Sequence, residues 1–401
     1  MNDIIKMALS KCDDRTGSGV LNKKVIERFL TYVSFDTQSD EESETFPSAE
    51  KEKDLGRYLE NEFKEIGLSD VAMDDYGYVY ATLPASTGKE NNDVLAFIAH
   101  MDVADAAPAD DIHTIISTEN GKNVIRTDRR TLLGADDKAG LAEMVTAVEE
   151  MLGRPEIKHP TIRLVVTPDE EVGQGTKYID MNRVAAKYAY TIDGEALGEL
   201  NYETWNGSCA IVEFTGVSIH PGIGYKILKN AAIMAAEFVN SLPEDETPTT
   251  TKDRVGFYFV SSMKGENASA QVRIELRDFE KDGLQKKKDF VISLVDKINE
   301  KYGDGSCRVK IEDTYPNMKE YIMPQHEYLV QRVRDCYKAC GVELIETSVR
   351  GGTDGSTLSQ MGLPTPNLGT GALACHSVDE HIAVEDMEKM VEVIIDLSTR
   401  F

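Results

Sequence analysis

The chain has 401 residues, 41% of them hydrophobic, which suggests two or three domains with a sizeable buried core. Its formal net charge of −26 argues against nucleic acid or an anionic membrane as a partner, because phosphate binding needs clustered Lys and Arg. Residues 1–19 lack the apolar core of a signal peptide, and no run approaches the roughly 20 apolar residues of a membrane span, so we expect a cytoplasmic protein.

From about residue 21, the order helix, strands, helix and strand predicts an open α/β sheet, in which ligands collect at the carboxyl ends of strands. The apolar run 94–99 (VLAFIA) is typical of a strand buried on both faces, and His100 and Asp102 follow it. Both side chains then point to the same side, so Asp102 is placed to orient His100 if that histidine binds a metal. The alternative is a strand-end histidine that is hydrogen-bonded to a neighbouring aspartate.

The segment 132–140 (LLGADDKAG) leads through a glycine-containing turn into a helix that starts near Asp136 and Asp137. Apolar residues follow at helical spacing: Leu141, Met144, Val145, Val148, Met151 and Leu152. Capping of the helix N-terminus would explain one of the two aspartates, but it does not need both.

Two further strands are followed by acidic residues. The strand 161–167 (TIRLVVT) precedes Asp169, Glu170 and Glu171, and the strand 188–192 (YAYTI) precedes Asp193. Three consecutive acids usually indicate a solvated loop, and a single Asp usually indicates a turn. Directly after a core strand, they also suit a cation site, with one carboxylate as ligand and its neighbour free for proton transfer.

Around residue 206 the pattern changes to strand, helix, two strands, helix and strand. The predicted strands are 208–219, 255–263, 269–278 and 307–312, and the predicted helices are 227–242 and 284–301. This β-α-β-β-α-β order predicts a ferredoxin-like domain at 207–314, inserted into a discontinuous catalytic domain formed by 1–206 and 315–401.

The last candidate ligand is His376, in the segment 371–380 (GALACHSVDE), which a predicted helix follows. One bridging carboxylate, two histidines and two further acids meet the needs of two metal ions about 3.5 to 4 Å apart. Spacing alone does not decide which carboxylate has which part. A nucleophilic Cys375 is disfavoured, because it would leave the carboxylates unexplained.

The six cysteines show no zinc-finger or CxxC spacing, and disulfides are unexpected in a reducing compartment. Cys336 and Cys340 are four residues apart on a predicted helix, where core packing is favoured over a metal pair.

Seven short motifs, spread in order over nearly the whole chain, carry a resemblance to a known family. They are HMD at 100–102, LLGADDKAG at 132–140, TPDEEVG at 167–173, YTIDG at 190–194, IHPG at 219–222, RGGTDG at 350–355 and HSVDE at 376–380. The chain resembles the M20 family of di-zinc peptidases, and within it most closely the tripeptide aminopeptidases. The resemblance implies an α/β catalytic domain of zinc-peptidase type, with a mixed, mainly parallel sheet flanked by helices, and the inserted ferredoxin-like domain as a lid.

For the metal site, the resemblance implies two zinc ions per subunit. His100 and Asp193 are then terminal ligands of one ion, Glu171 and His376 are terminal ligands of the other, and Asp136 bridges both. Co²⁺ or Mn²⁺ would accept the same ligands.

For catalysis, the resemblance implies that Glu170 is the general base. The metals lower the pKa of a bridging water towards neutrality, Glu170 takes its proton, and the hydroxide attacks the peptide carbonyl. Glu170 then protonates the leaving amine. Asp102 matches the family's aspartate that orients the first histidine, His100.

In the lid, the resemblance implies that His220 hydrogen-bonds the tetrahedral intermediate, often across a homodimer formed through the lid. Arg277 and Arg350 are candidates to bind a substrate carboxylate, and Asn230 matches a lid asparagine that meets substrate. The alternatives are an exposed loop histidine, surface ion pairs for the arginines and a plain helix-surface asparagine.

The favoured function is a metal-dependent aminopeptidase that releases the N-terminal residue of short peptides such as tripeptides. The alternatives are a di-zinc dipeptidase or N-acyl amino acid deacylase on the same scaffold, and a non-catalytic metal- or peptide-binding protein. Only 33 residues separate Asp102 from Asp136, fewer than in the family's tripeptide aminopeptidases. We therefore expect residues 103–130 to form an abbreviated, irregular edge of the site.

Overall fold

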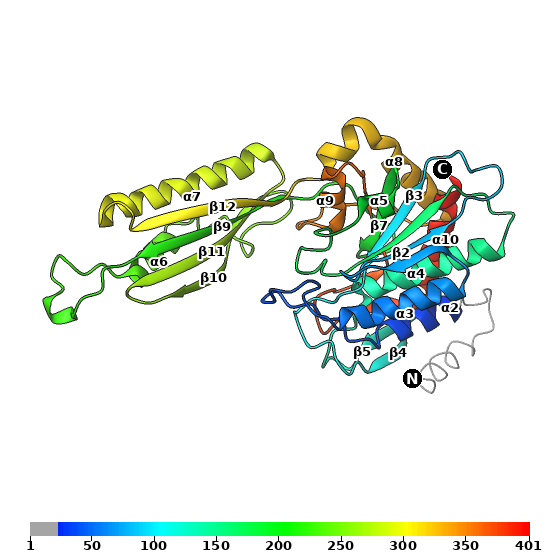
Figure 1. The fold of residues 1–401 in the computed structure, drawn as a ribbon, viewed down its shortest axis with the longest axis horizontal. Coiled ribbons are helices and arrows are strands. Elements are labelled where there is room, and N and C mark those ends of the chain that lie inside the picture. Colours follow the sequence, from blue (N-terminus) through cyan, green and yellow to red (C-terminus); the bar gives the residue numbers. More distant parts are fainter. Residues whose placement is uncertain (1–22) are drawn as a thin grey trace. The chain divides into compact units, whose positions relative to one another are not determined.

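The computed structural model describes residues 23–401, and the segment 1–19 considered above lies outside them. The chain divides into two compact units (Figure 1). Of the described residues, unit 1 comprises 23–202, Met318–Ser348 and Thr353–Phe401, and unit 2 comprises Glu203–Asn317 and Val349–Gly352. Within residues 23–401, no helix is both long and apolar enough to cross a membrane.

Unit 1 is built on an eight-stranded sheet with the order β1-β2-β6-β3-β7-β14-β8-β13. The strands are β1 (Ser69–Met73), β2 (Val79–Leu83), β3 (Leu95–His100), β6 (Ile162–Thr167), β7 (Tyr188–Gly194), β8 (Glu199–Asn201), β13 (Ile345–Glu346) and β14 (Asn367–Gly369). β3 pairs in parallel with β6 and β7, and β7 with β14, whereas β2 pairs antiparallel with β1 and β6. The predicted mixed, mainly parallel sheet is confirmed, and its central strand β3 is buried along its whole length.

Helices pack on both faces of this sheet. Alternate residues of β3 point to opposite faces and belong to two different cores. One core contains Leu95, Phe97 and Ala99. It is shared by α2 (Lys23–Tyr32), α3 (Glu52–Glu65), α4 (Ala135–Gly153), α8 (Lys319–Cys340) and α10 (Val384–Thr399). The other core contains Ala96 and Ile98, together with residues of α5 (Met181–Val184) and α9 (Asp354–Gln360).

The expectation of an irregular edge at 103–130 is wrong for part of that segment. It contains the hairpin of β4 (Thr114–Glu119) and β5 (Lys122–Thr127), which joins β15 (Ala372–Leu373) and β16 (His381–Ala383) in a sheet of order β15-β16-β5-β4. Asn120 and Gly121 form its turn and both have positive φ, as the favoured two-residue hairpin turn requires. The Asn-Gly pair in the sequence is the signal for this hairpin.

Unit 2 has one four-stranded antiparallel sheet of order β10-β11-β9-β12. Its elements are β9 (Asn206–Thr215), the 3-10 turn η1 (Pro221–Ile223), α6 (Ala231–Val239), β10 (Phe257–Gly265), β11 (Ser269–Asp278), α7 (Lys281–Tyr302) and β12 (Cys307–Tyr315). Apolar side chains of α6 and α7 share one core with those of the sheet. The predicted ferredoxin-like order of elements is confirmed. Helix α6 is shorter than predicted, because the side chain of Asn230 caps its N-terminus.

Candidate metal centre

The residues predicted to bind metal meet at one edge of the large sheet of unit 1. His100 is the last residue of β3, Glu171 follows β6, and Asp193 lies near the end of β7. Because β6, β3 and β7 are neighbouring parallel strands, their carboxyl ends lie side by side. The fold therefore gathers residues that are distant in the sequence.

The ring of His100 is buried and contacts acidic residues on both sides. Its Nε2 lies 3.0 Å from Asp136 Oδ1 and 3.3 Å from Asp193 Oδ1. Its Nδ1 lies 3.1 Å from the carbonyl oxygen of Asp102 and 3.3 Å from Asp102 Oδ1. One ring nitrogen thus faces Asp136 and Asp193, and the other is held by Asp102.

The second oxygen of Asp136 faces the second histidine. Asp136 Oδ2 lies 3.2 Å from His376 Nε2, and the same nitrogen lies 2.9 Å from Glu171 Oε2. The other oxygen of Glu171, Oε1, is buried and has no hydrogen-bond partner. Asp136 therefore lies between His100 and His376, with one oxygen towards each.

Asp102 also fixes the backbone of the acidic loop after β6. Its two carboxylate oxygens accept the backbone N–H groups of Glu170 and Glu171, at 3.0 and 3.1 Å. Asp102 thus holds His100 largely through its carbonyl oxygen, while its carboxylate positions the two glutamates. The sequence indicated the contact with His100 but not the contacts with the loop.

Asp102 also belongs to a buried cluster of three carboxyl groups. Glu52, Asp102 and Asp169 have oxygen atoms within 4.8 Å of one another. Glu52 Oε2 accepts the backbone N–H of Asp169, at 3.2 Å. Burial, together with the charges of Asp102 and Asp169, raises the pKa of Glu52 to about 10. Glu52 is therefore protonated near neutral pH, which relieves the repulsion within the cluster.

The two adjacent aspartates have different parts. Asp137 Oδ1 accepts the backbone N–H of Gly140, at 3.2 Å, which is the contact of a helix cap, and Oδ2 accepts the N–H of His100, at 3.2 Å. Both Asp136 and Asp137 have non-helical backbone angles, so the regular helix begins after them. Helix capping thus explains the position of Asp137. The carboxylate of Asp136 instead faces the histidines of the candidate metal centre.

Glu380 is a residue of the site that sequence reasoning missed. Its buried carboxylate accepts the backbone N–H groups of Leu133 (2.7 Å) and Gly134 (2.8 Å) through Oε2, and that of Asp136 (3.0 Å) through Oε1. It therefore fixes the loop that carries Asp136. The HSVDE motif contains this glutamate, but no local pattern shows which backbone it contacts.

Asp354 was also missed, although it lies in the RGGTDG motif. It is buried, and Oδ2 accepts a hydrogen bond from the hydroxyl of Thr167, the last residue of β6, at 2.8 Å. Burial raises its pKa to about 6.

The site has strongly shifted pKa values because many acids are buried together. Burial raises the pKa of Glu171 and that of Asp193 to about 7, and the charge of Asp136 adds to both effects. Hydrogen bonds with Asp136 and Glu171 raise the pKa of His376 to about 11. For Asp136 itself, burial opposes ionisation, but the contacts with His100 and His376 outweigh burial and lower its pKa.

These residues fit divalent cations. Two sets of potential ligand atoms lie within 4.8 Å of one another, namely His100 with Asp136 and Glu171, and His100 with Asp137 and Asp193. Imidazole nitrogen and carboxylate oxygen are common zinc ligands. A cation would also give Glu171 Oε1 a partner and offset the negative charge that raises the carboxyl pKa values.

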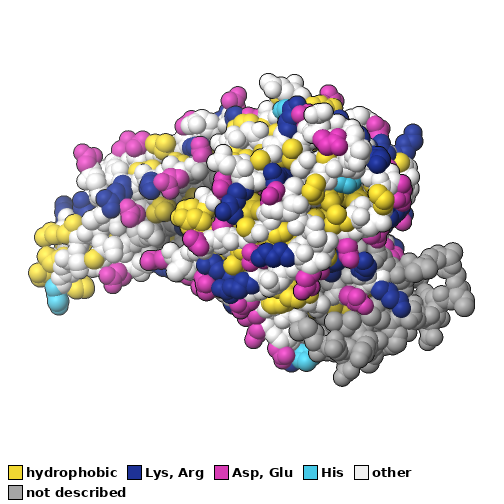
Figure 2. Space-filling view, turned by 45° about the vertical axis from the view of Figure 1, so that its right-hand side comes forward, with side chains coloured by type: hydrophobic (Ala, Val, Ile, Leu, Met, Phe, Trp, Pro, Cys, Tyr) yellow, Lys and Arg dark blue, Asp and Glu magenta, His cyan; other side chains and the backbone are white. Residues whose placement is uncertain are grey.

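The predicted lid residues all lie in unit 2. His220 is exposed on the turn after β9, and its Nδ1 accepts the backbone N–H of Gly222, at 3.1 Å. Asn230 Oδ1 accepts the N–H of Ile233, at 3.2 Å, as the cap of α6. Large apolar side chains gather on the exposed loop between β9 and α6 (Figure 2): Ile223, Tyr225 and Ile227.

Both predicted arginines have partners within unit 2. Arg277 pairs with Glu275 and donates to the carbonyl oxygens of Ser208 (3.3 Å) and Leu276 (3.1 Å). Arg350 donates to the carbonyl oxygen of Thr251 at 3.2 Å and to its hydroxyl at 3.1 Å. The guanidinium of Arg350 also lies 4.9 Å from the centre of the Trp205 ring.

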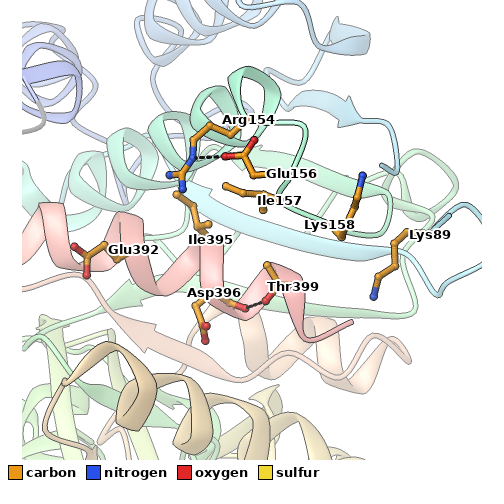
Figure 3. A pocket seen from close by; sticks show the side chains of 9 residues that line it. All are labelled: Lys89, Arg154, Glu156, Ile157, Lys158, Glu392, Ile395, Asp396 and Thr399. Atoms are coloured by element: carbon orange, nitrogen blue, oxygen red, sulfur yellow. Dashed lines mark hydrogen bonds and ion pairs between the residues drawn. The ribbon is translucent and has the colours of Figure 1, made fainter. Parts of the chain in front are cut away.

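A hollow of about 490 Å³ lies elsewhere on unit 1, beside α10 (Figure 3). Its lining residues are Lys89, Arg154, Glu156, Ile157, Lys158, Glu392, Ile395, Asp396 and Thr399. None of them is a predicted ligand or catalytic residue, so this hollow is separate from the candidate metal centre.

Known proteins resemble the chain over nearly its whole length. The family model described as "Peptidase family M20/M25/M40" matches residues 96–400. Peptidase T of Clostridium perfringens (strain ATCC 13124) is 41% identical over 400 residues, which cover 94% of this chain and 98% of that protein. The crystal structure of aminopeptidase PepT from Bacillus cereus has a TM-score of 0.76 at 24% identity, and that of a tripeptidase from Staphylococcus aureus has 0.79 at 21%. Each covers 95% of this chain and 99% of the other chain.

Proposed function

Because the chain belongs to peptidase family M20/M25/M40, as its motifs predicted, we propose that its metal centre hydrolyses short peptides and releases their N-terminal residue. The predicted class of enzyme, a metallo-aminopeptidase like peptidase T, is confirmed by the relationship over most of the chain. The observation that carries the proposed mechanism is that the two oxygens of Asp136 face His100 and His376.

The proposed metal ligands follow this arrangement. His100 and Asp193 would hold one divalent cation, Glu171 and His376 would hold a second, and Asp136 would bridge both. Zinc is the proposed metal, and Co²⁺ or Mn²⁺ would suit the same nitrogen and oxygen donors. When bound, the ions would activate a water molecule and polarise the peptide carbonyl.

Glu170 is the proposed general base. The carboxylate of Asp102 fixes its backbone, and its neighbour Glu171 faces His376. Burial raises the pKa of Glu170 well above its usual value, and the charge of Asp193 adds to this effect, so the carboxyl group has a strong affinity for a proton. Glu170 would accept a proton from the attacking water and deliver it to the amine nitrogen when the peptide C–N bond breaks.

For unit 2, we propose the role of a lid. The Nδ1 atom of His220 accepts a hydrogen bond, so the neutral ring carries its proton on Nε2 and can donate it to the oxygen of the tetrahedral intermediate. Arg277 and Arg350 are the proposed partners of the substrate carboxylate, and Asn230 is a further proposed substrate contact. Both arginines already have partners within unit 2, so each would have to give up those contacts to bind the substrate carboxylate.

A homodimer through the lid is also proposed. The exposed apolar residues Ile223, Tyr225 and Ile227 support it, since large apolar side chains grouped on a surface loop are typical of protein interfaces. Sedimentation of the wild-type protein and of a Tyr225→Ser variant would test the dimer, which the variant should weaken. The cytoplasmic location stays a prediction from the sequence.

Product analysis tests the specificity. Zinc-loaded protein is incubated with trialanine, N-acetyl-trialanine and dialanine, with and without chelator, and the products are identified by mass spectrometry. The proposal expects chelator-sensitive loss of one N-terminal residue from free trialanine alone. Cleavage of dialanine or of the blocked peptide instead would favour the dipeptidase or the deacylase, and no cleavage would favour a binding protein.

A further inference from the structure

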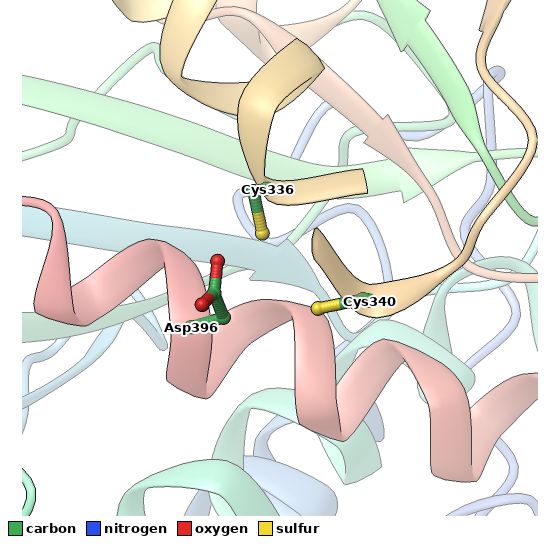
Figure 4. Close-up of side chains that lie close together, drawn as sticks. All are labelled: Cys336, Cys340 and Asp396. Atoms are coloured by element: carbon green, nitrogen blue, oxygen red, sulfur yellow. The ribbon is translucent and has the colours of Figure 1, made fainter. Parts of the chain in front are cut away.

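Two cysteines and an aspartate form a second cluster of metal-binding side chains in unit 1 (Figure 4). Cys336 and Cys340 lie one turn apart on α8, and Asp396 lies on α10, which packs against α8. The two sulfur atoms and a carboxylate oxygen are within 4.8 Å of one another. No residue of the candidate metal centre takes part.

Core packing alone explains only part of this cluster. Cys336 is fully buried and its thiol donates to the carbonyl oxygen of Val393, at 3.3 Å, as a packed core cysteine would. Cys340 is only partly buried, however, and a charged carboxylate lies against both thiols. A carboxylate beside two thiols is an unfavourable choice for an apolar contact; here Arg400 pairs with it, and a metal ion would suit the same position.

The acidities of the two thiols differ. The neighbouring Cys340, together with burial, raises the pKa of Cys336. The neighbouring Cys336 lowers the pKa of Cys340, and this effect outweighs burial and the charges of Asp396 and Glu392, which raise it. Cys340 is therefore the thiol that loses its proton first, and a thiolate is the form that binds metal.

We propose that Cys336, Cys340 and Asp396 form a site for a thiophilic divalent cation such as zinc, with solvent completing the coordination. Two thiolates at i and i+4 on one helix and a carboxylate from the facing helix supply three of the four ligands that zinc usually takes. Binding releases two thiol protons to solvent, while Asp396 is already ionised, as its ion pair with Arg400 requires.

This site is open to solvent, and the guanidinium group of Arg400 competes with a metal ion for Asp396. Asp396 is one of the residues that line the open hollow of Figure 3, and 32% of its side chain is exposed. Arg400 Nε lies 2.6 Å from Asp396 Oδ2. A bound ion therefore competes with Arg400 for the carboxylate, and it would link α8 to α10 directly.

Cadmium gives a direct test, because thiolate ligation produces a charge-transfer band in the near ultraviolet that nitrogen and oxygen ligands do not. Full-length protein is titrated with Cd²⁺, and the bound metal is counted. We expect the band and one cadmium ion beyond those of the candidate metal centre, and the loss of both in Cys340→Ser and Cys336→Ser. If Cys336→Ser fails to fold, the test rests on Cys340→Ser, because Cys340 is only partly buried.

Two control variants exclude two of the four other thiols. One control is Cys375→Ser, because Cys375 is next to the predicted ligand His376. The other is Cys12→Ser, because Cys12 lies outside the described residues. The proposal requires both variants to keep the band. The absence of a band in the wild type, or its survival in Cys340→Ser, would overturn the proposal.

Asp396 and Arg400 allow a matched comparison. Asp396→Asn removes a ligand and the ion pair, whereas Arg400→Gln removes the ion pair alone. We expect about tenfold or greater weakening of cadmium binding at this site in Asp396→Asn, and stronger binding in Arg400→Gln. Equal affinities in the two variants would show that Asp396 only pairs with Arg400, and would contradict its part in the site.

Discussion

Glu380 Oε1 accepts the backbone N–H of Asp136, at 3.0 Å. The other oxygen of the same carboxylate accepts the N–H groups of Leu133 and Gly134. One buried side chain thus fixes the backbone on which the proposed bridging ligand is mounted. Mutation of a residue that orients a metal ligand typically costs about 10-fold to 100-fold in metal affinity or activity.

We predict that Glu380→Gln weakens metal binding by about tenfold or more, because the amide group of Gln cannot accept on both sides. Metal affinity is measured by competition with a chelator. At saturating metal, the activity of the variant should come much closer to the wild-type value than it does at limiting metal. The matched control is Glu385→Gln, since Glu385 also accepts a backbone N–H, that of Asn123, but not in the loop of Asp136. Equal losses in both variants would contradict the positioning role.

We predict that Glu170→Gln lowers kcat by about a hundredfold to ten-thousandfold with unchanged metal content, because a general base is lost and no ligand is removed. The neighbouring change Glu171→Gln should instead lower the metal content, because Glu171 faces His376. Steady-state kinetics and elemental analysis of both variants check this pair. Near-normal turnover in Glu170→Gln would refute the assignment of the base.

We predict that the metal-free protein loses stability as the pH rises from about 4 to 7. Glu171 and Asp193 keep their protons to about pH 7 in the fold, against 4.5 and 3.8 as their usual values. The folded state then binds more protons than the unfolded state in this range, so stability falls with increasing pH. His376 acts in the same direction between 6.5 and about 11.

Bound cations replace these protons, so the loaded protein should lack this decrease and should bind metal more tightly at higher pH. Thermal unfolding of chelated and loaded protein at about pH 5 and about pH 8 tests this. A chelated protein that is as stable at the higher pH as at the lower would disprove it.

We predict that Gly140→Ala destabilises the fold by about 1 to 3 kcal/mol and reduces metal binding. A Cβ atom at Gly140 would lie 2.0 Å from the carbonyl oxygen of Ile192 and 2.4 Å from Asp137 Oδ1, so α4 would have to move from the end of β7. Gly153, at the other end of α4, has no atom within 4 Å of such a Cβ, so Gly153→Ala is the control and should be neutral or slightly stabilising. Denaturant unfolding of both variants gives the comparison.

Much of the architecture could be predicted from short stretches of sequence. Continuous apolar runs predicted β3, β6 and β7, and the polar residues after them predicted where ligands would gather, because parallel strands present their carboxyl ends together. The alternation of patterns after residue 206 predicted the ferredoxin-like unit. The Asn-Gly turn of the β4–β5 hairpin is an equally local signal, and it contradicts the expectation that the whole of 103–130 is irregular.

The sequence by itself determined the chemical types of the site residues and the elements that carry them, because helical and strand periodicities depend on neighbouring residues. Only the tertiary structure decided that the two oxygens of Asp136 face different histidines, and that Glu380 holds the Asp136 loop from 244 residues away. It also decided that Asp137 caps a helix while Asp136 does not. Such contacts depend on how the whole chain closes around its core, and no local preference of the residues involved encodes them.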